Sequence, residues 1–233
     1  MTMATDVEVI DLAATPLREL NQRLHDAAAT GGPTRWRIIN PNGAHALAVG
    51  IDAAFEVEIE GHTGYYTAGM NKHANVRIVG NAGVGCGENI MSGTIHITGN
   101  ASQACAATGR GGLVIVDGDA SARCGISMKG VDIVVKGSIG HMSAFMAQSG
   151  ALVVCGDAGD SLGDSIYETH IYVRGSVAGL GADCIEKDLK DFHREELGRL
   201  LAAAGADATV DEFKRYGSAR RLYNFNIDHA GEY

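Results

Sequence analysis

The chain has 233 residues, of which 45% are hydrophobic, 6% are aromatic and 32 are glycines, a composition that suits small-residue repeats better than a bulky globular core. Its formal net charge of −9 disfavours binding to nucleic acid or to anionic membranes. Because we find no apolar run long enough to cross a membrane, no secretory leader and an odd count of cysteines, we expect a cytoplasmic chain with reduced thiols and no membrane segment.

Residues 1–43 are expected to form an N-terminal cap of strand, helix and strand. Thr15 and Pro16 resemble an N-cap and a first helical residue, and the run Gly31-Gly32-Pro33 ends the helix. Short strands are expected on either side, over residues 7–12 and 35–39. Such a cap would cover the open end of a repeat structure, which otherwise exposes its core.

Seven glycines recur at one constant interval through the middle of the chain: Gly61, Gly80, Gly99, Gly118, Gly137, Gly156 and Gly175. A constant period near 20 residues is the signature of a solenoid. Two aliphatic columns precede the glycines, by four and by two positions, and alternate with a mixed column. The column four positions before the glycines consists of Val57, Val76, Ile95, Val114, Ile133, Leu152 and Ile171. The column two positions before them consists of Ile59, Ile78, Ile97, Val116, Val135, Val154 and Val173. This alternation predicts one strand per repeat with a single buried face.

The positions after each glycine predict turns. Most of the following residues are short and polar, and we expect each glycine to take a positive φ there. Seven positions after the glycine no residue is larger than alanine, which indicates a crowded inside corner. We therefore predict an all-β solenoid over residues 44–185: a right-handed parallel β-helix of about seven 19-residue coils, capped by helical segments. Its hand follows from the usual hand of parallel crossovers.

Residues 186–233 are expected to form a helical tail, with one helix from Glu186 to Ala204 and a short one starting near Thr209. Residues 216–225 are aromatic and basic in an acidic chain. They either pack back on the solenoid or dock on a partner. The second interpretation makes the tail, together with one exposed turn, the candidate partner contact: Arg110, Tyr216, Arg220, Arg221, Tyr223 and Phe225.

Three groups of residues resemble chemical motifs but occupy repeat positions. Cys86, Cys105 and Cys124 share one column, and we interpret them as packing residues rather than as ligands or redox groups, since no CxxC pair accompanies them. The run from Gly83 to Gly87 lacks the helix that a phosphate-binding loop requires. The aspartates of one coil, at positions 157, 160 and 164, fall in turns. We assign no catalytic, cofactor-binding or metal-binding residue.

The coils with Gly83-Val84-Gly85-Cys86-Gly87 and Gly179-Leu180-Gly181-Ala182-Asp183 resemble the GXGXG domain. That domain forms the C-terminal β-helix of the glutamate synthase large subunit and a subunit of formylmethanofuran dehydrogenase. As a free-standing chain with this tail, the sequence is most similar to the small glutamate-synthase-like subunit of N-methylglutamate synthase (methylamine–glutamate N-methyltransferase).

The resemblance implies a non-catalytic subunit of a hetero-oligomeric enzyme that makes N-methylglutamate and ammonia from glutamate and methylamine. The partners would be an amidotransferase-like subunit and a glutamate-synthase-like subunit, and the second of these would carry FMN and iron–sulfur clusters. No family catalytic residue maps onto this chain; position 2, for example, is Thr2 rather than the nucleophilic cysteine. Two alternatives stay open: a subunit of another GXGXG oxidoreductase, and a stand-alone β-helix enzyme acting on polysaccharides.

Overall fold

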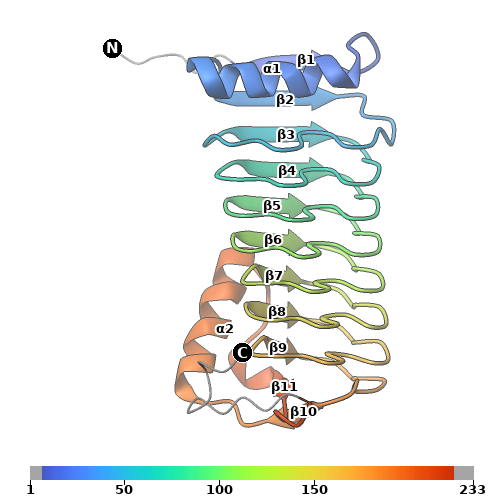
Figure 1. Cartoon of the computed structure of the whole chain (residues 1–233), viewed down its shortest axis with the longest axis vertical. Coiled ribbons are helices and arrows are strands. Elements are labelled where there is room, and N and C mark those ends of the chain that lie inside the picture. Colours follow the sequence, from blue (N-terminus) through green and yellow to red (C-terminus); the bar gives the residue numbers. More distant parts are fainter. Residues whose placement is uncertain (1–6, 223–233) are drawn as a thin grey trace, which may run out of the picture.

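The computed structural model describes residues 7–222 and confirms the predicted parallel β-solenoid of about seven turns. Its strands form one 11-stranded sheet in the order β1-β2-β3-β4-β5-β6-β7-β8-β9-β11-β10, with helix α1 at one end and helix α2 on the flank of the other (Figure 1). The predictions for residues 1–6 and 223–233, including those for Tyr223 and Phe225, lie outside the described residues.

The elements follow the chain in a simple order. They are β1 (Val7–Asp11), α1 (Leu17–Thr30), β2 (Arg35–Ile39), β3 (Glu56–Glu60), β4 (Asn75–Val79), β5 (Thr94–Ile97), β6 (Leu113–Val116), β7 (Asp132–Val135), β8 (Ala151–Val154), β9 (His170–Val173), β10 (Cys184–Lys187), α2 (Asp191–Ala204), the 3₁₀ turn η1 (Val210–Glu212) and β11 (Lys214–Ser218).

Parallel pairing between successive coils holds the 19-residue register. Val57 pairs with Val76, Val76 with Ile95 and Ile95 with Val114, so that each aliphatic column becomes a continuous stack. Both columns are buried along their whole length. Stacking is what buries these side chains, since one strand and its turns cannot enclose an apolar face alone.

The seven repeat glycines are required by a close approach, and our expectation of a positive φ at each of them is wrong. Only Gly61 and Gly80 have a φ in the positive range. At Gly118, an added Cβ would lie under 3.0 Å from Asn100 Oδ1 and from the carbonyl oxygen of Gly99, both in the preceding coil. The same obstruction, by the polar atom of the preceding turn residue, occurs at Gly99, Gly137, Gly156 and Gly175.

That polar atom accepts a hydrogen bond from the next coil. The Asn100 amide N–H donates to Asn81 Oδ1 (2.8 Å), and the Asp119 N–H donates to Asn100 Oδ1 (2.8 Å). The ladder runs from His62 Nδ1 to Ser176 through six such bonds. Each acceptor crosses over the glycine of the next coil, so a side chain there would separate the two coils.

The corner column seven residues after each glycine is confirmed as buried from Ala68 to Gly163, whereas its last member, Ala182, is exposed. Ala68, Ala106 and Ala144 are fully buried in left-handed conformations with φ of 53–55°, and Gly87 has a φ of 69°. The left-handed backbone favours glycine and disfavours bulky side chains. The buried corner positions therefore favour glycine and alanine for two reasons: there is little space for a side chain, and the backbone conformation is left-handed.

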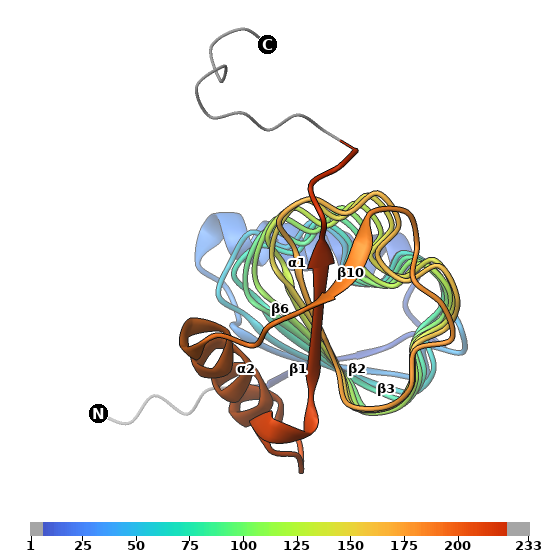
Figure 2. The same ribbon diagram turned by 90° about the horizontal axis from the view of Figure 1, so that it is seen from below.

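The C-terminal end differs from the expected helical tail. Residues 184–187 form β10 rather than the start of a helix, and α2 begins only at Asp191. The unexpected strand β11 pairs antiparallel with both β9 and β10, and it closes the end of the sheet (Figure 2). Local periodicity could not reveal this, because both partners of β11 lie on the far side of α2 in the sequence. The domain boundary that we predicted from the sequence, between residues 185 and 186, falls inside β10.

At the other end, α1 lies against the first coils and buries Leu20, Leu24 and Ala27 in the common core. Its N-cap residue is Pro16, without a side-chain cap, so Thr15 does not act as the cap that the sequence suggested. Over residues 7–222, neither helix has the length and hydropathy needed to cross a membrane.

Gly118→Ala is expected to destabilise the fold by about 1–3 kcal/mol, because its Cβ must displace Asn100 or separate two coils. Gly198→Ala, in the middle of α2, is the matched control. Its Cβ would meet only Val210 Cγ2 at 3.6 Å, and alanine favours a helix by about 1 kcal/mol. Urea unfolding followed by circular dichroism measures both. A Gly118→Ala chain as stable as the unaltered one would contradict the close-approach explanation.

Candidate functional site

The outward face of the sheet carries two parallel columns of side chains. The first contains Arg35, Glu56, Asn75, Thr94, Leu113, Asp132, Ala151 and His170, and the second contains Arg37, Glu58, Arg77, His96, Ile115, Val134, Val153 and Tyr172. Both columns are polar from β2 to β5. From β6 onwards the second column is largely apolar, and the first alternates between apolar and polar residues. The change divides one face into two surfaces.

Helix α2 covers the apolar part. Leu197, Leu200 and Leu201 pack with Val134 and Val153 in a second hydrophobic cluster, separate from the solenoid interior. Each fully buried aliphatic side chain of this kind contributes about 1.5–3 kcal/mol. Arg199 also binds Asp132, with Nη2 and Oδ2 3.0 Å apart. The chain therefore supplies its own cover for β6–β9, with α2 running beside these strands (Figure 1) on the outer side of the sheet (Figure 2).

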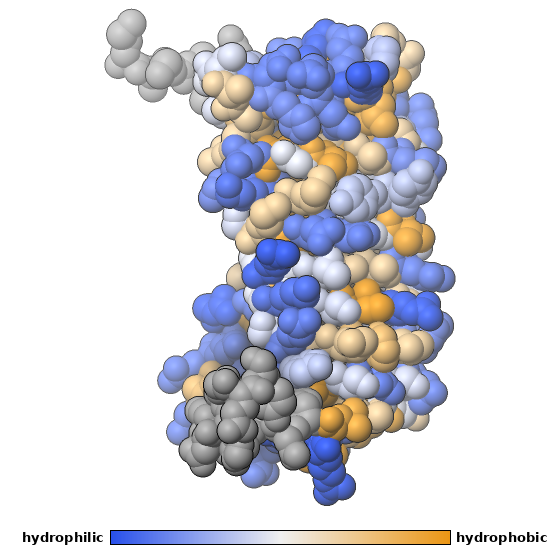
Figure 3. Space-filling model, in the orientation of Figure 1, coloured by the Kyte–Doolittle hydropathy of each residue, from blue (hydrophilic) through white to orange (hydrophobic). Residues whose placement is uncertain are grey.

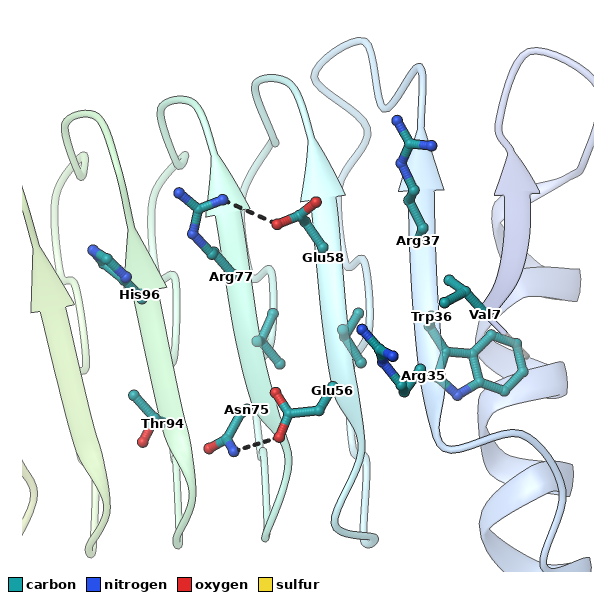
Figure 4. Close-up of a pocket in the computed structure, with 12 residues that line it drawn as sticks. Val7, Arg35, Trp36, Arg37, Glu56, Glu58, Asn75, Arg77, Thr94 and His96 are labelled. Atoms are coloured by element: carbon teal, nitrogen blue, oxygen red, sulfur yellow. Dashed lines mark hydrogen bonds and ion pairs between the residues drawn. The ribbon is translucent and has the colours of Figure 1, made fainter. Parts of the chain in front are cut away.

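The polar part is an open trough of about 590 Å³ over β1–β5. Figure 4 shows its two rows of side chains: Arg37, Glu58, Arg77 and His96 in one, and Arg35, Glu56, Asn75 and Thr94 in the other.

Bonds between neighbouring coils organise these rows. Arg77 Nη1 lies 3.0 Å from Glu58 Oε2, and Asn75 Nδ2 donates to Glu56 Oε1 at 2.8 Å. Arg37 binds Glu60 with two hydrogen bonds. These groups are about half exposed, and solvent-exposed ion pairs contribute only about 0–1 kcal/mol each.

A His–Asp–Lys chain marks the boundary between trough and helix. His96 Nε2 lies 2.9 Å from Asp117 Oδ2, and Lys136 Nζ lies 2.8 Å from Asp117 Oδ1. Burial alone would raise the pKa of Asp117, but the hydrogen bonds from Lys136 and His96 outweigh it and lower the pKa. The arrangement orients the imidazole, as in many catalytic sites, yet among the described lining residues the only hydroxyl belongs to Thr94 on the same strand.

A second polar cluster lies between α2 and β9. Tyr172 Oη donates to Glu196 Oε2 at 2.6 Å, and His170 Nδ1 lies 2.8 Å from the same oxygen. Burial raises the pKa of Tyr172, and the Glu196 carboxylate raises it further. His193 is 2% exposed, and its Nδ1 accepts the Lys190 amide N–H at 3.1 Å. Because the members bind one another, this cluster anchors α2 to the sheet.

The three cysteines that resembled a chemical motif are buried within the repeat. Cys86, Cys105 and Cys124 are at most 1% exposed, and burial raises the pKa of Cys86. For Cys124 the hydrogen bond with Cys105 raises the pKa most, followed by burial. Raised pKa values disfavour the thiolate that ligates metals and attacks electrophiles. Within residues 7–222, no three His, Cys, Asp or Glu side chains are grouped so as to hold a metal ion.

The glycine-rich run and the aspartates are also committed to turns. The N–H groups of Gly83, Gly85 and Gly87 all donate to carbonyls of neighbouring coils, so they are not available to a phosphate. Asp157 Oδ1 accepts both the N–H and the hydroxyl of Ser176, and these bonds lower its pKa.

The candidate partner contacts lie in two separate places. Arg110 is exposed in the loop between β5 and β6. Tyr216 lies in β11 and is only 6% exposed, so it belongs to the core that closes the solenoid. Arg220 forms an ion pair with Glu168 (2.7 Å), and Arg221 is exposed, with its N–H bonded to Asp183 Oδ1.

Sequence reasoning missed the trough. Its signal was the change along the mixed column, from Glu58, Arg77 and His96 to Ile115, Val134 and Val153. The open trough can be recognised from this change only when α2 is known to cover the apolar part of the same face.

His193 predicts a pH dependence of stability. Burial lowers its pKa to about 4 from the ordinary 6.5, and the charges of Arg215 and His170 add to the effect. A histidine that folds neutral stabilises the fold fully above pH about 6.5 and loses that contribution as the pH falls towards 4. Urea unfolding at pH 7 and pH 4.5 should therefore show a smaller difference in the free energy of unfolding for His193→Gln than for the unaltered chain. If both chains showed the same difference in the free energy of unfolding between pH 7 and pH 4.5, the pH dependence could not be assigned to His193.

Comparison with known proteins places the chain in a family. No protein-family model matches the sequence. The chain is 58% identical over 226 residues to Protein GlxC of Rhizobium meliloti (strain 1021), and the match covers 97% of this chain and 99% of that protein. Since the match extends over nearly all of both chains, it spans the repeat and the segments on either side of it. The chain belongs to the GlxC family.

Proposed function

We propose that this protein is a non-catalytic structural subunit of a glutamate-synthase-like, multi-subunit enzyme. The observation that carries the proposal is the commitment of almost every chemically suggestive group to the repeat: thiols in the core, aspartates in turns and glycine N–H groups between coils. The resemblance of the coils to the GXGXG domain and the full-length similarity to Protein GlxC support it.

The most specific form of the proposal is a subunit of N-methylglutamate synthase. The enzyme would convert glutamate and methylamine to N-methylglutamate and ammonia. An amidotransferase-like subunit and a glutamate-synthase-like subunit with FMN and iron–sulfur clusters would carry the chemistry. The aromatic and basic residues of positions 216–225 support this choice over glutamate synthase or formylmethanofuran dehydrogenase.

A bracing role suits the mechanics of the solenoid. Eleven paired strands span ten steps of about 4.8 Å, so the sheet is a rod on the order of 50 Å long. Coil-to-coil hydrogen bonds run along it without a break in register from β2 to β9. Such a rod holds the subunits bound to it at a constant separation.

A stand-alone polysaccharide enzyme has less support. Saccharide clefts present aromatic faces on which sugars stack, and the aromatic residue beside the trough, Trp36, is 3% exposed. The carboxylates of Glu56 and Glu58 are bonded to Asn75 and Arg77 across the floor.

Purification of the tagged chain from its native host tests the proposal. We expect two larger subunits to co-purify, with the absorption spectrum of FMN and iron–sulfur clusters, and the complex to form N-methylglutamate from glutamate and methylamine. The isolated chain should be colourless and inactive. A chain that purifies alone, without a flavoprotein, would contradict the proposal, and polysaccharide cleavage by the isolated chain would replace it.

Removal of residues 223–233 tests the role of the tail. Because β11 ends at Ser218, this truncation leaves every described strand in place, whereas removal from Tyr216 would cut into β11. We expect an unchanged thermal unfolding midpoint and loss of co-purifying subunits. A truncated chain that still binds its partners at full affinity would show that the tail is not the docking segment.

A further inference from the structure

The trough and the seat of α2 are parts of one surface. Thr94 and Leu113 are neighbours in the first column, and His96 and Ile115 are neighbours in the second. The polar residues of β2–β5 therefore lie in line with the residues that α2 covers. The chain itself shows that these two columns accommodate a helix.

The open part has the length of a short helix. From β2 to β5 there are three steps of about 4.8 Å, or roughly 14 Å along the solenoid axis. At a rise of 1.5 Å per residue, that is about 10 helical residues.

A partner cannot add a strand here. β2, β3, β4 and β5 are each paired on both edges, so their backbone groups are used within the sheet. A peptide that binds by strand addition needs a free edge. An occupant of the trough must therefore bind through side chains, as a helix does in a groove.

The charged side chains on the floor of the trough determine which kind of partner helix can bind there. Arg37, Glu58 and Arg77 follow one another in neighbouring coils, with the sign of the charge alternating at each step (Figure 4). The spacing of about 4.8 Å is close to the 5.4 Å pitch of a helix, so residues at i, i+4 and i+7 of a partner helix can face successive coils.

Arg37 is held by Glu60, so the floor together with this partner carries three arginines and three glutamates and is balanced in charge. A partner helix must therefore match the alternation of the charges along the floor.

We propose that the trough over β2–β5 is the binding site for a helix of a partner subunit, lying in line with α2, whose charges alternate in sign, with carboxylates facing Arg37 and Arg77 and a basic residue facing Glu58. The proposal rests on the proposed function in so far as the partner is a subunit of the same complex. The exposed ion pairs of the floor are weak, so they exchange for intermolecular pairs at little cost.

On the face turned towards the viewer in Figure 1, Figure 3 shows hydrophobic residues dispersed among hydrophilic ones, without one continuous apolar band.

The test is charge reversal in the complex purified from the native host. Arg37→Glu combined with Arg77→Glu places new carboxylates beside Glu58 and Glu60, so we expect a small decrease in the thermal unfolding midpoint of the isolated chain, with the circular dichroism spectrum of the folded solenoid retained. We expect it to weaken binding of the partner subunits by about tenfold or more, since paired charges across an interface turn repulsive. Arg18→Glu combined with Lys129→Glu changes the charge equally at two exposed positions outside the trough, and should leave binding unchanged.

A photo-cross-linking residue identifies the occupant. Placed at Thr94, it should capture a helical segment of one partner subunit in which acidic and basic residues alternate, whereas at Val84, an exposed position outside the trough, it should not capture that segment. Cross-links to a second copy of this chain or to its own segments would overturn the proposal. So would full-affinity binding by the doubly reversed chain in an intact complex, with the proposed function left standing. If the unaltered chain forms no complex at all, both proposals fail.

Discussion

The structure depends on one repeated contact: after each of the strands β3–β8, a polar side chain accepts a hydrogen bond from the backbone of the next coil, passing over a glycine to reach it. Asn81, Asn100 and Asp119 show the pattern in three successive coils. A net contribution of about 1 kcal/mol per hydrogen bond makes each contact modest. Their effect is on register, because the contact forms only where a glycine of the next coil lies directly beneath the acceptor.

Register then determines the rest of the fold. With each coil aligned to its neighbour, the aliphatic columns stack into one core and the small corner residues meet corner residues. The same alignment engages the polar groups of the turns in hydrogen bonds between neighbouring coils. A protein built in this way has few free functional groups within its coils, so recognition is left to the outward face and to the two ends. The divided outward face follows from this, since α2 covers only the part whose side chains are apolar.

Much of this was open to prediction. The 19-residue period, the buried columns and strand β2 at residues 35–39 were predicted correctly, because alternation and repeat spacing are local properties. The reason for the glycines was wrong. Positive φ is a property of one residue, whereas the obstruction at Gly118 comes from Asn100 in another coil. The trough was visible in the sequence only as a gradual change in one column, without any sign of what covered its apolar half.

The sequence by itself determined the solenoid, because each coil repeats the same short-range pattern and stacking identical units is the one way to bury their common apolar face. Only the tertiary structure decided how the chain ends. β11 lies between β9 and β10, and α2 lies on β6–β9, because those edges and that apolar face exist only after the coils have stacked. Tyr216 is buried and the polar rows of β2–β5 are left open for the same reason: contacts between residues distant in the sequence depend on surfaces that folding creates.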